Sequence, residues 1–284
     1  MTSGHITVDK TKLKYIIEGD GVPCLVIGML SNFYPPVFSK EIKKYIKFIF
    51  VDFKIFVPSV PIDVNEISMD SIVKDLDGVR IFLGFEKIAV LGHSVFGIVA
   101  LEYAYKYPEH TSHIIMIGSA SPNMTETNLK KGSEFWESDA SEERKMIQKK
   151  NNEPLTEEFL NMVSPTKALA QQYIANSPFY WYDQTYDCSW IWEGLELNME
   201  FFDYFYSEII RGKDITQKIL NITIPMFLVM GRYDYAAPYI LWENLIDEIP
   251  DLTYFLFGKS GHWPMFEEQK LFDSRLIEWI TKTK

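Results

Sequence analysis

Three short segments of the chain carry side chains that could act as a nucleophile, a base and an acid. In the first segment, an apolar run from Lys87 to Leu91 leads into Gly92-His-Ser94, and helical spacing begins within three residues. A sharp strand-to-helix turn of this kind forces a serine hydroxyl outward in strained geometry. It also places the hydroxyl at a helix N-terminus, which favours a developing negative charge. The segment predicts Ser94 as a nucleophile, although a plain Gly-Ser turn remains the alternative.

Two later segments supply the expected partners of the serine. Asp234 in Gly231-Arg-Tyr-Asp234 and His262 in Ser260-Gly-His262 each follow an apolar, strand-like run. The chain order Ser, Asp, His predicts a triad in which His262 accepts the proton of Ser94 and Asp234 orients the imidazole. The alternatives are an aspartate in a solvated turn and a histidine that caps a helix.

The elements that must position these side chains alternate along most of the chain. Strands are expected at 6–9, 13–17, 24–27, 47–53, 87–91, 113–117, 225–230 and 252–257, and helices at 68–84, 98–107, 238–249 and 267–281. Short apolar strands that alternate with helices predict a parallel sheet covered on both faces. All carboxyl ends of such strands meet at one edge, where the three side chains would lie together. Alternation stops between residues 122 and 212, which predicts an inserted helical cap on a core of 1–121 and 213–284.

Taken together, these motifs resemble those of serine hydrolases with the α/β-hydrolase fold, over nearly the whole chain and with the cap as the variable part. The resemblance implies a mostly parallel sheet flanked by helices, with an inserted helical cap. Within that superfamily, the stretches 231–235, 259–264 and 192–200 are most similar to proline-iminopeptidase-related hydrolases.

The sequence departs from the family pattern at two places. Phe96 stands where the family usually has a small residue two positions after the nucleophile, so the turn is reshaped or the ring points into the pocket. The loop Ile27-Gly-Met-Leu-Ser31 replaces the His-Gly-Gly-Pro-Gly of proline iminopeptidases. An oxyanion hole is made of backbone N–H groups, so the resemblance still implies Met29 and Val95 as its donors.

The cap supplies the candidate substrate contacts. Aromatic residues concentrate between Tyr173 and Tyr206, and the candidates for lining a pocket, together with Phe96, are Trp181, Trp190 and Trp192. Phe202, Phe205, Tyr206 and Ile209 recur at helical spacing, so we expect part of this set to form the core of the cap itself, with a substrate-lining role as the alternative for each of them. Glu193, Glu196 and Glu200 would share one face of a helix. They lie either on the surface or in the pocket, where they would hold a substrate ammonium group.

Composition excludes several other classes of function. The net charge of −11 disfavours nucleic acid and anionic lipid, and the longest apolar run is far shorter than the ~20 residues of a membrane span. Cys24 and Cys188 lie far apart, and no histidine has acidic or cysteine neighbours at metal-ligand spacing. We therefore expect a soluble, cytoplasmic protein with a small-molecule substrate and without metal or cofactor. The oligomeric state is left open.

The leading interpretation is a serine hydrolase that cleaves a small carboxylic ester through an acyl-enzyme on Ser94. A proline-iminopeptidase-like aminopeptidase with the same triad is the first alternative. A non-catalytic binding protein that keeps the fold is the second, and Phe96 is its best support.

Overall fold

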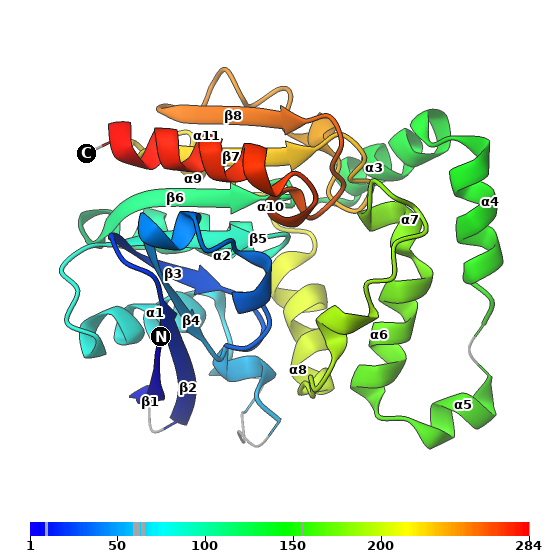
Figure 1. Cartoon of the computed structure of the whole chain (residues 1–284), viewed down its shortest axis with the longest axis horizontal. Coiled ribbons are helices and arrows are strands. Elements are labelled where there is room, and N and C mark those ends of the chain that lie inside the picture. The colour runs from blue at the N-terminus through cyan, green and yellow to red at the C-terminus, as the bar shows by residue number, and fades with distance from the viewer. Residues whose placement is uncertain (9–10, 59–62, 64–65, 155, 284) are drawn as a thin grey trace.

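The computed structural model describes residues 1–8, 11–58, 63, 66–154 and 156–283. Among them, eight strands form one sheet in the order β1-β2-β4-β3-β5-β6-β7-β8 (Figure 1). The strands are β1 (Thr2–Val8), β2 (Thr11–Glu18), β3 (Val22–Ile27), β4 (Ile46–Val51), β5 (Ile88–His93), β6 (Thr111–Ile117), β7 (Met226–Gly231) and β8 (Leu252–Phe257). β2 is antiparallel to both β1 and β4, and all other pairs are parallel. The predicted strands and the mostly parallel sheet are confirmed, except that Asp9 lies outside the described residues.

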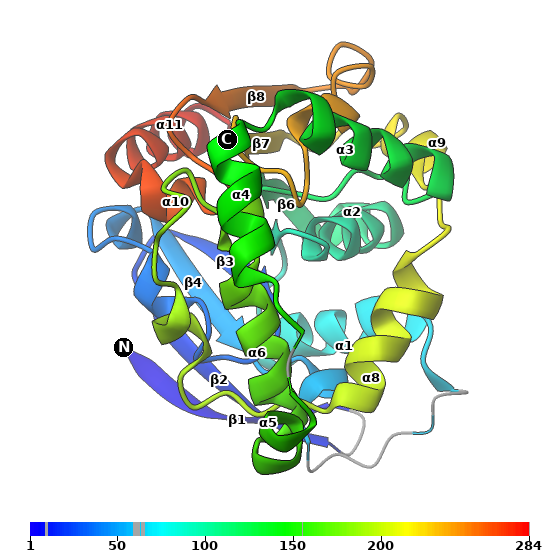
Figure 2. The same ribbon diagram turned by 90° about the vertical axis from the view of Figure 1, so that its right-hand side faces the viewer.

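The central strands are apolar along their whole length because helices cover both faces of the sheet. Every residue of β5 and β7 is buried. Helices α1 (Met69–Phe82) and α2 (Phe96–Lys106) lie on one face, and α11 (Gln269–Lys282), preceded by the short α10 (Pro264–Glu267), lies on the other (Figure 2). Ser68 caps α1, since its hydroxyl accepts a hydrogen bond from Ser71 N at 3.1 Å. Helices α1, α2 and α11 agree with the helices predicted at 68–84, 98–107 and 267–281.

The prediction of a helix at 238–249 is wrong. The segment holds a short 3₁₀ helix, η8 (Tyr239–Leu241), followed by successive turns. The apolar spacing is still used, because Trp242 is fully buried and its Nε1–H donates to Ser119 O at 2.9 Å. The hydrogen bonds after Trp242 reach back by three residues in some places and by four in others. The apolar spacing therefore indicates which side chains are buried, but it does not correspond to a continuous helix.

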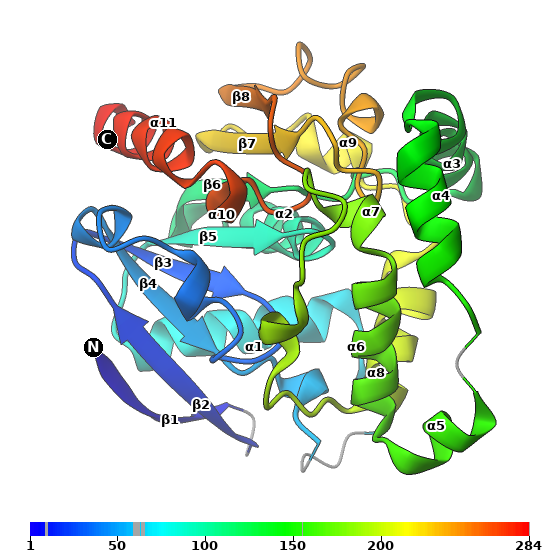
Figure 3. The ribbon, with the colours of Figure 1, turned by 45° about the vertical axis from the view of Figure 1, so that its right-hand side comes forward.

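Between β6 and β7 the chain leaves the sheet and forms a group of helices. They are α3 (Glu126–Asp139), α4 (Glu142–Asn151), α5 (Glu157–Met162), α6 (Pro165–Ala175), α7 (Ser177–Tyr180), α8 (Met199–Tyr204), a π-helical turn η7 (Phe205–Ile210) and α9 (Thr216–Ile219). Helices α3 to α8 stand beyond the carboxyl ends of the strands (Figures 1 and 3). This is the edge at which parallel α/β sheets place their ligand sites.

The chain leaves and returns through a narrow neck of paired backbone. Met124 N donates to Lys213 O at 2.7 Å, and Gly212 N donates back to Met124 O at 2.9 Å. Ile215 N donates to Pro122 O at 3.0 Å. The two crossing points therefore lie side by side.

No helix among the described residues is long and apolar enough to cross a bilayer.

Candidate active site

Ser94 occupies a strained turn between a strand and a helix. β5 ends at His93, and α2 begins at Phe96. The φ angle of Ser94 is 59°, in the left-handed region that costs a non-glycine residue free energy. The neighbouring strand holds the turn in place, because Ser94 N donates to Ile117 O at 3.0 Å. The geometry directs the Ser94 side chain into a cavity beneath the cap.

Close packing at this turn requires glycine at positions 92 and 97. A Cβ atom on Gly92 would lie 2.2 Å from Phe96 O, and one on Gly97 would lie 1.9 Å from Ser119 Oγ. Position 96 carries no such restriction, which explains how a phenylalanine is accommodated there.

The Phe96 ring packs between the core and the cap. It makes edge contacts with Phe53 and Phe56, and it stacks on Phe205 of the cap with ring centroids 5.9 Å apart. The ring also lines the cavity. The unusual residue therefore joins the first turn of α2 to the cap and leaves the turn at Ser94 intact.

Asp234 and His262 meet next to this turn. Asp234 follows β7, is fully buried, and its Oδ2 atom lies 2.7 Å from His262 Nδ1. Its other oxygen, Oδ1, accepts hydrogen bonds from Ala236 N and Ala237 N at 3.0 and 2.8 Å. A carboxylate held in this way keeps the Nδ1–H tautomer of the histidine. The Nε2 atom of His262 is then free to accept a proton.

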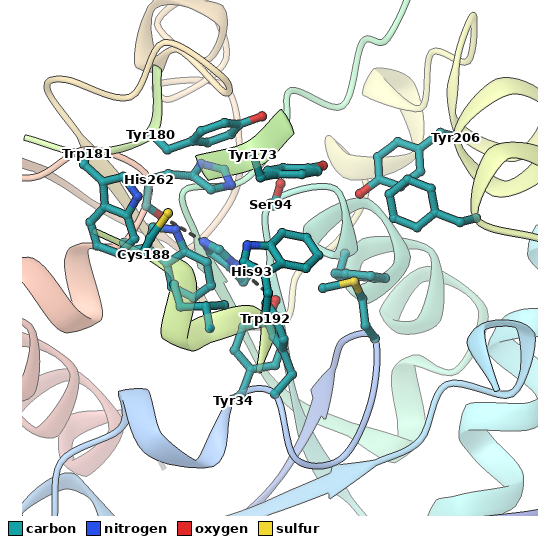
Figure 4. A pocket seen from close by; sticks show the side chains of 16 residues that line it. Tyr34, His93, Ser94, Tyr173, Tyr180, Trp181, Cys188, Trp192, Tyr206 and His262 are labelled. Atoms are coloured by element: carbon teal, nitrogen blue, oxygen red, sulfur yellow. Dashed lines mark hydrogen bonds between the residues drawn. The ribbon is translucent and has the colours of Figure 1, made fainter. Parts of the chain in front are cut away.

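The cavity that Ser94 and His262 line is small and mostly apolar (Figure 4). Its volume is about 60 Å³. Core residues such as Met29 and Phe33 form one side, and cap residues such as Ile191 and Phe202 form the other. Among the described residues, the lining contains no lysine, arginine, aspartate or glutamate. An uncharged ligand therefore fits this cavity better than a charged one.

His93 supports the backbone of His262. Its Nε2 lies 2.8 Å from His262 O, a carbonyl that can only accept, so Nε2 carries the proton. Its Nδ1 then accepts a hydrogen bond from the Tyr34 hydroxyl at 3.1 Å. Burial, together with the neighbouring His262, lowers the pKa of His93 well below its usual value. His93 therefore stays neutral and holds the loop that carries His262.

Met29 lies on the loop after β3 and lines the cavity, while Val95 directly follows Ser94. Among the described residues, neither backbone amide donates a hydrogen bond to the protein. The Met29 loop is fixed from behind, because Asp52 Oδ1 accepts from Ser31 N at 2.9 Å and Phe53 N donates to Met29 O at 3.0 Å. Within the part of the chain that the structure describes, these two backbone N–H groups therefore remain available to a ligand.

The cap stretch from Pro178 to Tyr182 is fastened to both loops that carry Asp234 and His262. Phe179 O accepts from Tyr235 N at 2.9 Å, and Tyr180 O accepts from His262 N at 2.6 Å. From the other side, the buried guanidinium of Arg144 donates to the carbonyls of residues 178, 181 and 182 at 2.6, 2.8 and 2.7 Å. We name this stretch the 178–182 clamp. Each of its five backbone carbonyls accepts a hydrogen bond from a group outside the stretch.

Glu267 ties the clamp to the histidine loop through its carboxyl group. Oε2 accepts from Tyr182 N at 2.7 Å, and Oε1 accepts from Gly261 N and Trp263 N at 2.8 and 3.3 Å. Burial outweighs these hydrogen bonds and raises the pKa of Glu267 to about 7.

Two of the predicted cap tryptophans lie at the cavity and one does not. Trp181 and Trp192 line it. Trp190 points elsewhere, since its Nε1–H donates to the Tyr186 hydroxyl at 3.0 Å and its ring packs on Phe266. Trp190 therefore lies outside the lining of this cavity.

Glu193, Glu196 and Glu200, for which the sequence left a surface and a pocket position open, are exposed and lie outside the cavity. Glu196 accepts a hydrogen bond from Ser164. A shared helical face would need one continuous helix, whereas residues 193–198 are turn and irregular backbone.

Several lining residues were not singled out from the sequence. Phe33 and Tyr34 follow the end of β3, so the rule that strand ends gather at one edge could have found them. Tyr173 is the one aromatic residue of α6, and Cys188 carried no signal. Phe202 and Tyr206, for which the sequence left the core of the cap and the substrate site open, line the cavity.

The comparisons with known proteins agree with this architecture. The family model for the alpha/beta hydrolase fold matches residues 48–269. The "AB hydrolase superfamily protein YclE" of Bacillus subtilis (strain 168) is 32% identical over 274 residues, which cover 96% of each chain. "Proline iminopeptidase PfmaB" of Pestalotiopsis fici is 26% identical over 220 residues, covering 76% of this chain and 75% of that protein.

Among solved structures, an alpha/beta fold family hydrolase from Bacillus anthracis str. Sterne superposes with a TM-score of 0.70 at 23% identity. The match covers 100% of this chain and 99% of that one. The chain belongs to the α/β-hydrolase family and is a hydrolase of that superfamily.

Proposed function

We propose that this protein is a serine hydrolase that cleaves a small, uncharged carboxylic ester through an acyl-enzyme on Ser94. The observation that carries the proposal is the hydrogen-bonded pair Asp234–His262 beside a serine in a strained turn, with serine and histidine lining one cavity. The small apolar lining supports the choice of substrate.

The reaction follows from these positions. Ser94 Oγ attacks the ester carbonyl while His262 Nε2 takes the hydroxyl proton, and Asp234 stabilises the imidazolium. The N–H groups of Met29 and Val95 receive the oxyanion of the tetrahedral intermediate. The ester C–O bond then breaks, and the alcohol leaves with the proton from His262. Water repeats the sequence on the acyl-enzyme, releases the acid and restores Ser94.

We further propose that residues 122–212 form a cap domain on a core of 1–121 and 213–284. The paired backbone of the neck at Pro122–Met124 and Gly212–Ile215 supports this division. The cap then supplies most of the acyl-side surface of the cavity, through residues such as Tyr173, Trp181 and Trp192.

The similarity to a proline iminopeptidase favours a second candidate, an aminopeptidase with the same triad. That activity requires an acceptor for the substrate's ammonium group, and a carboxylate is the usual one. Among the described residues no carboxylate lines the cavity, and Asp234 beside it is already bonded to His262. The cavity therefore favours the esterase over the aminopeptidase.

A fluorophosphonate probe combined with a substrate panel tests the proposal. The probe should label the wild-type protein at Ser94, and the Ser94→Ala variant should be neither labelled nor active. The panel contains 4-nitrophenyl esters of short and long acids beside prolyl and alanyl 4-nitroanilides. Labelling at another serine, or activity that survives in Ser94→Ala, would refute the assignment. Cleavage of the prolyl anilide at the rate of the best ester would show that the aminopeptidase is the correct function.

A further inference from the structure

Three tyrosines from separate parts of the cap bring their hydroxyl groups together in the cavity. Tyr173 comes from α6, Tyr180 from α7 and Tyr206 from η7, and all three line the cavity with Ser94. The hydroxyl of Tyr173 interacts with those of both Tyr180 and Tyr206. In Figure 4 the three side chains lie above and beside Ser94, opposite Tyr34. We name them the tyrosine cluster.

The hydrogen bonds of the cluster are incomplete without a ligand. Each of the three hydroxyl groups carries one proton. Among the described residues, no hydrogen bond joins these hydroxyl groups to one another or to a group outside the cluster. Tyrosine hydroxyl groups inside a protein normally find a hydrogen-bond partner. At least one O–H donor therefore remains for an oxygen atom that enters the cavity.

The cluster and its surroundings carry no charge. Burial raises the pKa of Tyr173, Tyr180 and Tyr206, so all three phenols stay protonated at neutral pH. No charged side chain lines the cavity among the described residues. The other tyrosine of the lining, Tyr34, already bonds to His93. A hydroxyl or keto oxygen fits such a donor, whereas a carboxylate or an ammonium group would lack a counter-charge.

The local backbone at Tyr206 is unusual in a way that serves the cavity. Residues 205–210 form a π-helical turn, a conformation that is rare and frequent at functional sites. Within it, Phe205 is fully buried against Phe96, while the next residue, Tyr206, lines the cavity. The turn thus supplies a core contact and a cavity contact from successive residues.

We propose that the tyrosine cluster is a binding site for an uncharged oxygen on the acyl group, so that the preferred substrates are esters of short hydroxy or keto acids. This inference rests on the proposed esterase function. We assign the cavity to the acyl group, because this group stays bound to Ser94 while the alcohol leaves. A cavity of about 60 Å³ favours a short acyl chain.

Matched methyl esters test the proposal. Methyl butanoate is compared with methyl 3-hydroxybutanoate and methyl 3-oxobutanoate by following acid release, and each rate is divided by the rate with hydroxide. This division corrects for the activating effect of the extra oxygen. We expect the wild-type kcat/KM to favour at least one oxygen-bearing ester by about tenfold, the effect of one neutral hydrogen bond.

The variants Tyr173→Phe, Tyr180→Phe and Tyr206→Phe remove one hydroxyl each and keep the ring. We expect at least the central change, Tyr173→Phe, to lower the preference about fivefold or more. Tyr204→Phe is the matched control, since Tyr204 belongs to the cap but does not line the cavity, and it should leave the preference as in wild type.

The outcomes separate the two proposals. If short esters are cleaved without preference for the extra oxygen, or if all three phenylalanine variants keep the wild-type preference, the binding site is refuted and the esterase stands. If no ester is cleaved and the fluorophosphonate does not label Ser94, the esterase itself is refuted and the binding site falls with it.

Discussion

Arg144 should be the side chain outside the cavity on which the geometry of the site depends most. It lies on α4, is 5% exposed, and its guanidinium donates to three carbonyls of the 178–182 clamp. On its other side the clamp holds His262 N and Tyr235 N, the backbone on either side of the Asp234–His262 pair. Replacing Arg144 by methionine keeps an unbranched apolar side chain of about the length of the arginine's methylene stem and removes all three hydrogen bonds.

The magnitude follows from those three hydrogen bonds. A hydrogen bond to a charged group contributes about 1.5–3 kcal/mol, but the three share one guanidinium and are not additive. The variant also removes a buried charge, whose desolvation offsets part of the loss. We therefore expect Arg144→Met to lower the free energy of unfolding by about 2–4 kcal/mol. For a chain of 284 residues that corresponds to a fall in Tm of about 3–7 °C.

Urea unfolding and ester hydrolysis measure the two effects together. In the variant, Tyr180 O would no longer be held opposite His262 N. We therefore expect kcat to fall by about tenfold and KM to rise by less than that. Arg144→Lys can reach fewer carbonyls with its single ammonium and should lie between wild type and Arg144→Met. Arg211→Met is the matched control, since Arg211 is an exposed cap arginine whose loss should change stability by less than about 0.5 kcal/mol. If Arg144→Met is as stable as this control, our account of the clamp is wrong.

Two further predictions concern the acids of the site. Asp234→Asn keeps the shape of the side chain but permits the wrong imidazole tautomer, so kcat should fall by about 10³–10⁴-fold while the fold remains; a loss below tenfold in the ester assay would assign the role to another group. The folded-state pKa of Glu267 lies near 7, above its unfolded value, so the folded protein binds the extra proton and stability falls as pH rises from about 4.5 to about 7. Over the whole titration the free energy of unfolding falls by about 3 kcal/mol. Glu267→Gln cannot ionise, so the difference in unfolding free energy between pH 5 and pH 8 should shrink by about 2–3 kcal/mol. An unchanged difference would show that Glu267 titrates normally.

The core could be predicted from the sequence because its signals are local. Apolar runs such as 226–231 and 88–91 form strands wherever helices cover both faces of a sheet. The residues just after those strands, Ser94 and Asp234, then gather at one edge by topology alone. Close packing at Gly92 and Gly97 also acts over a few residues, which is why a phenylalanine between them left the turn recognisable.

The cap could not be predicted in the same way, because its contacts are long-range. The glutamates at 193, 196 and 200 share a face only in a helix, and backbone contacts of that segment break the helix. Trp190 and Trp192 are two residues apart, yet one packs on Phe266 and the other lines the cavity. Aromatic content showed that the cap is packed but not which rings face a ligand.

Under the proposed mechanism, the clamp couples the choice of substrate to the rate of catalysis at Tyr180 but not at Tyr206. Tyr180 contributes a hydroxyl to the cluster and, through its carbonyl, holds the backbone of His262. A substitution that shifts Tyr180 therefore also shifts the base, and its effect on specificity comes with a change in kcat. Tyr206 lies on η7, which packs on Phe96 and has no hydrogen bond to the loops of Asp234 or His262 among the described residues. New acyl specificities should therefore arise more readily around Tyr206, where the cavity wall can change while the acid–base pair stays fixed.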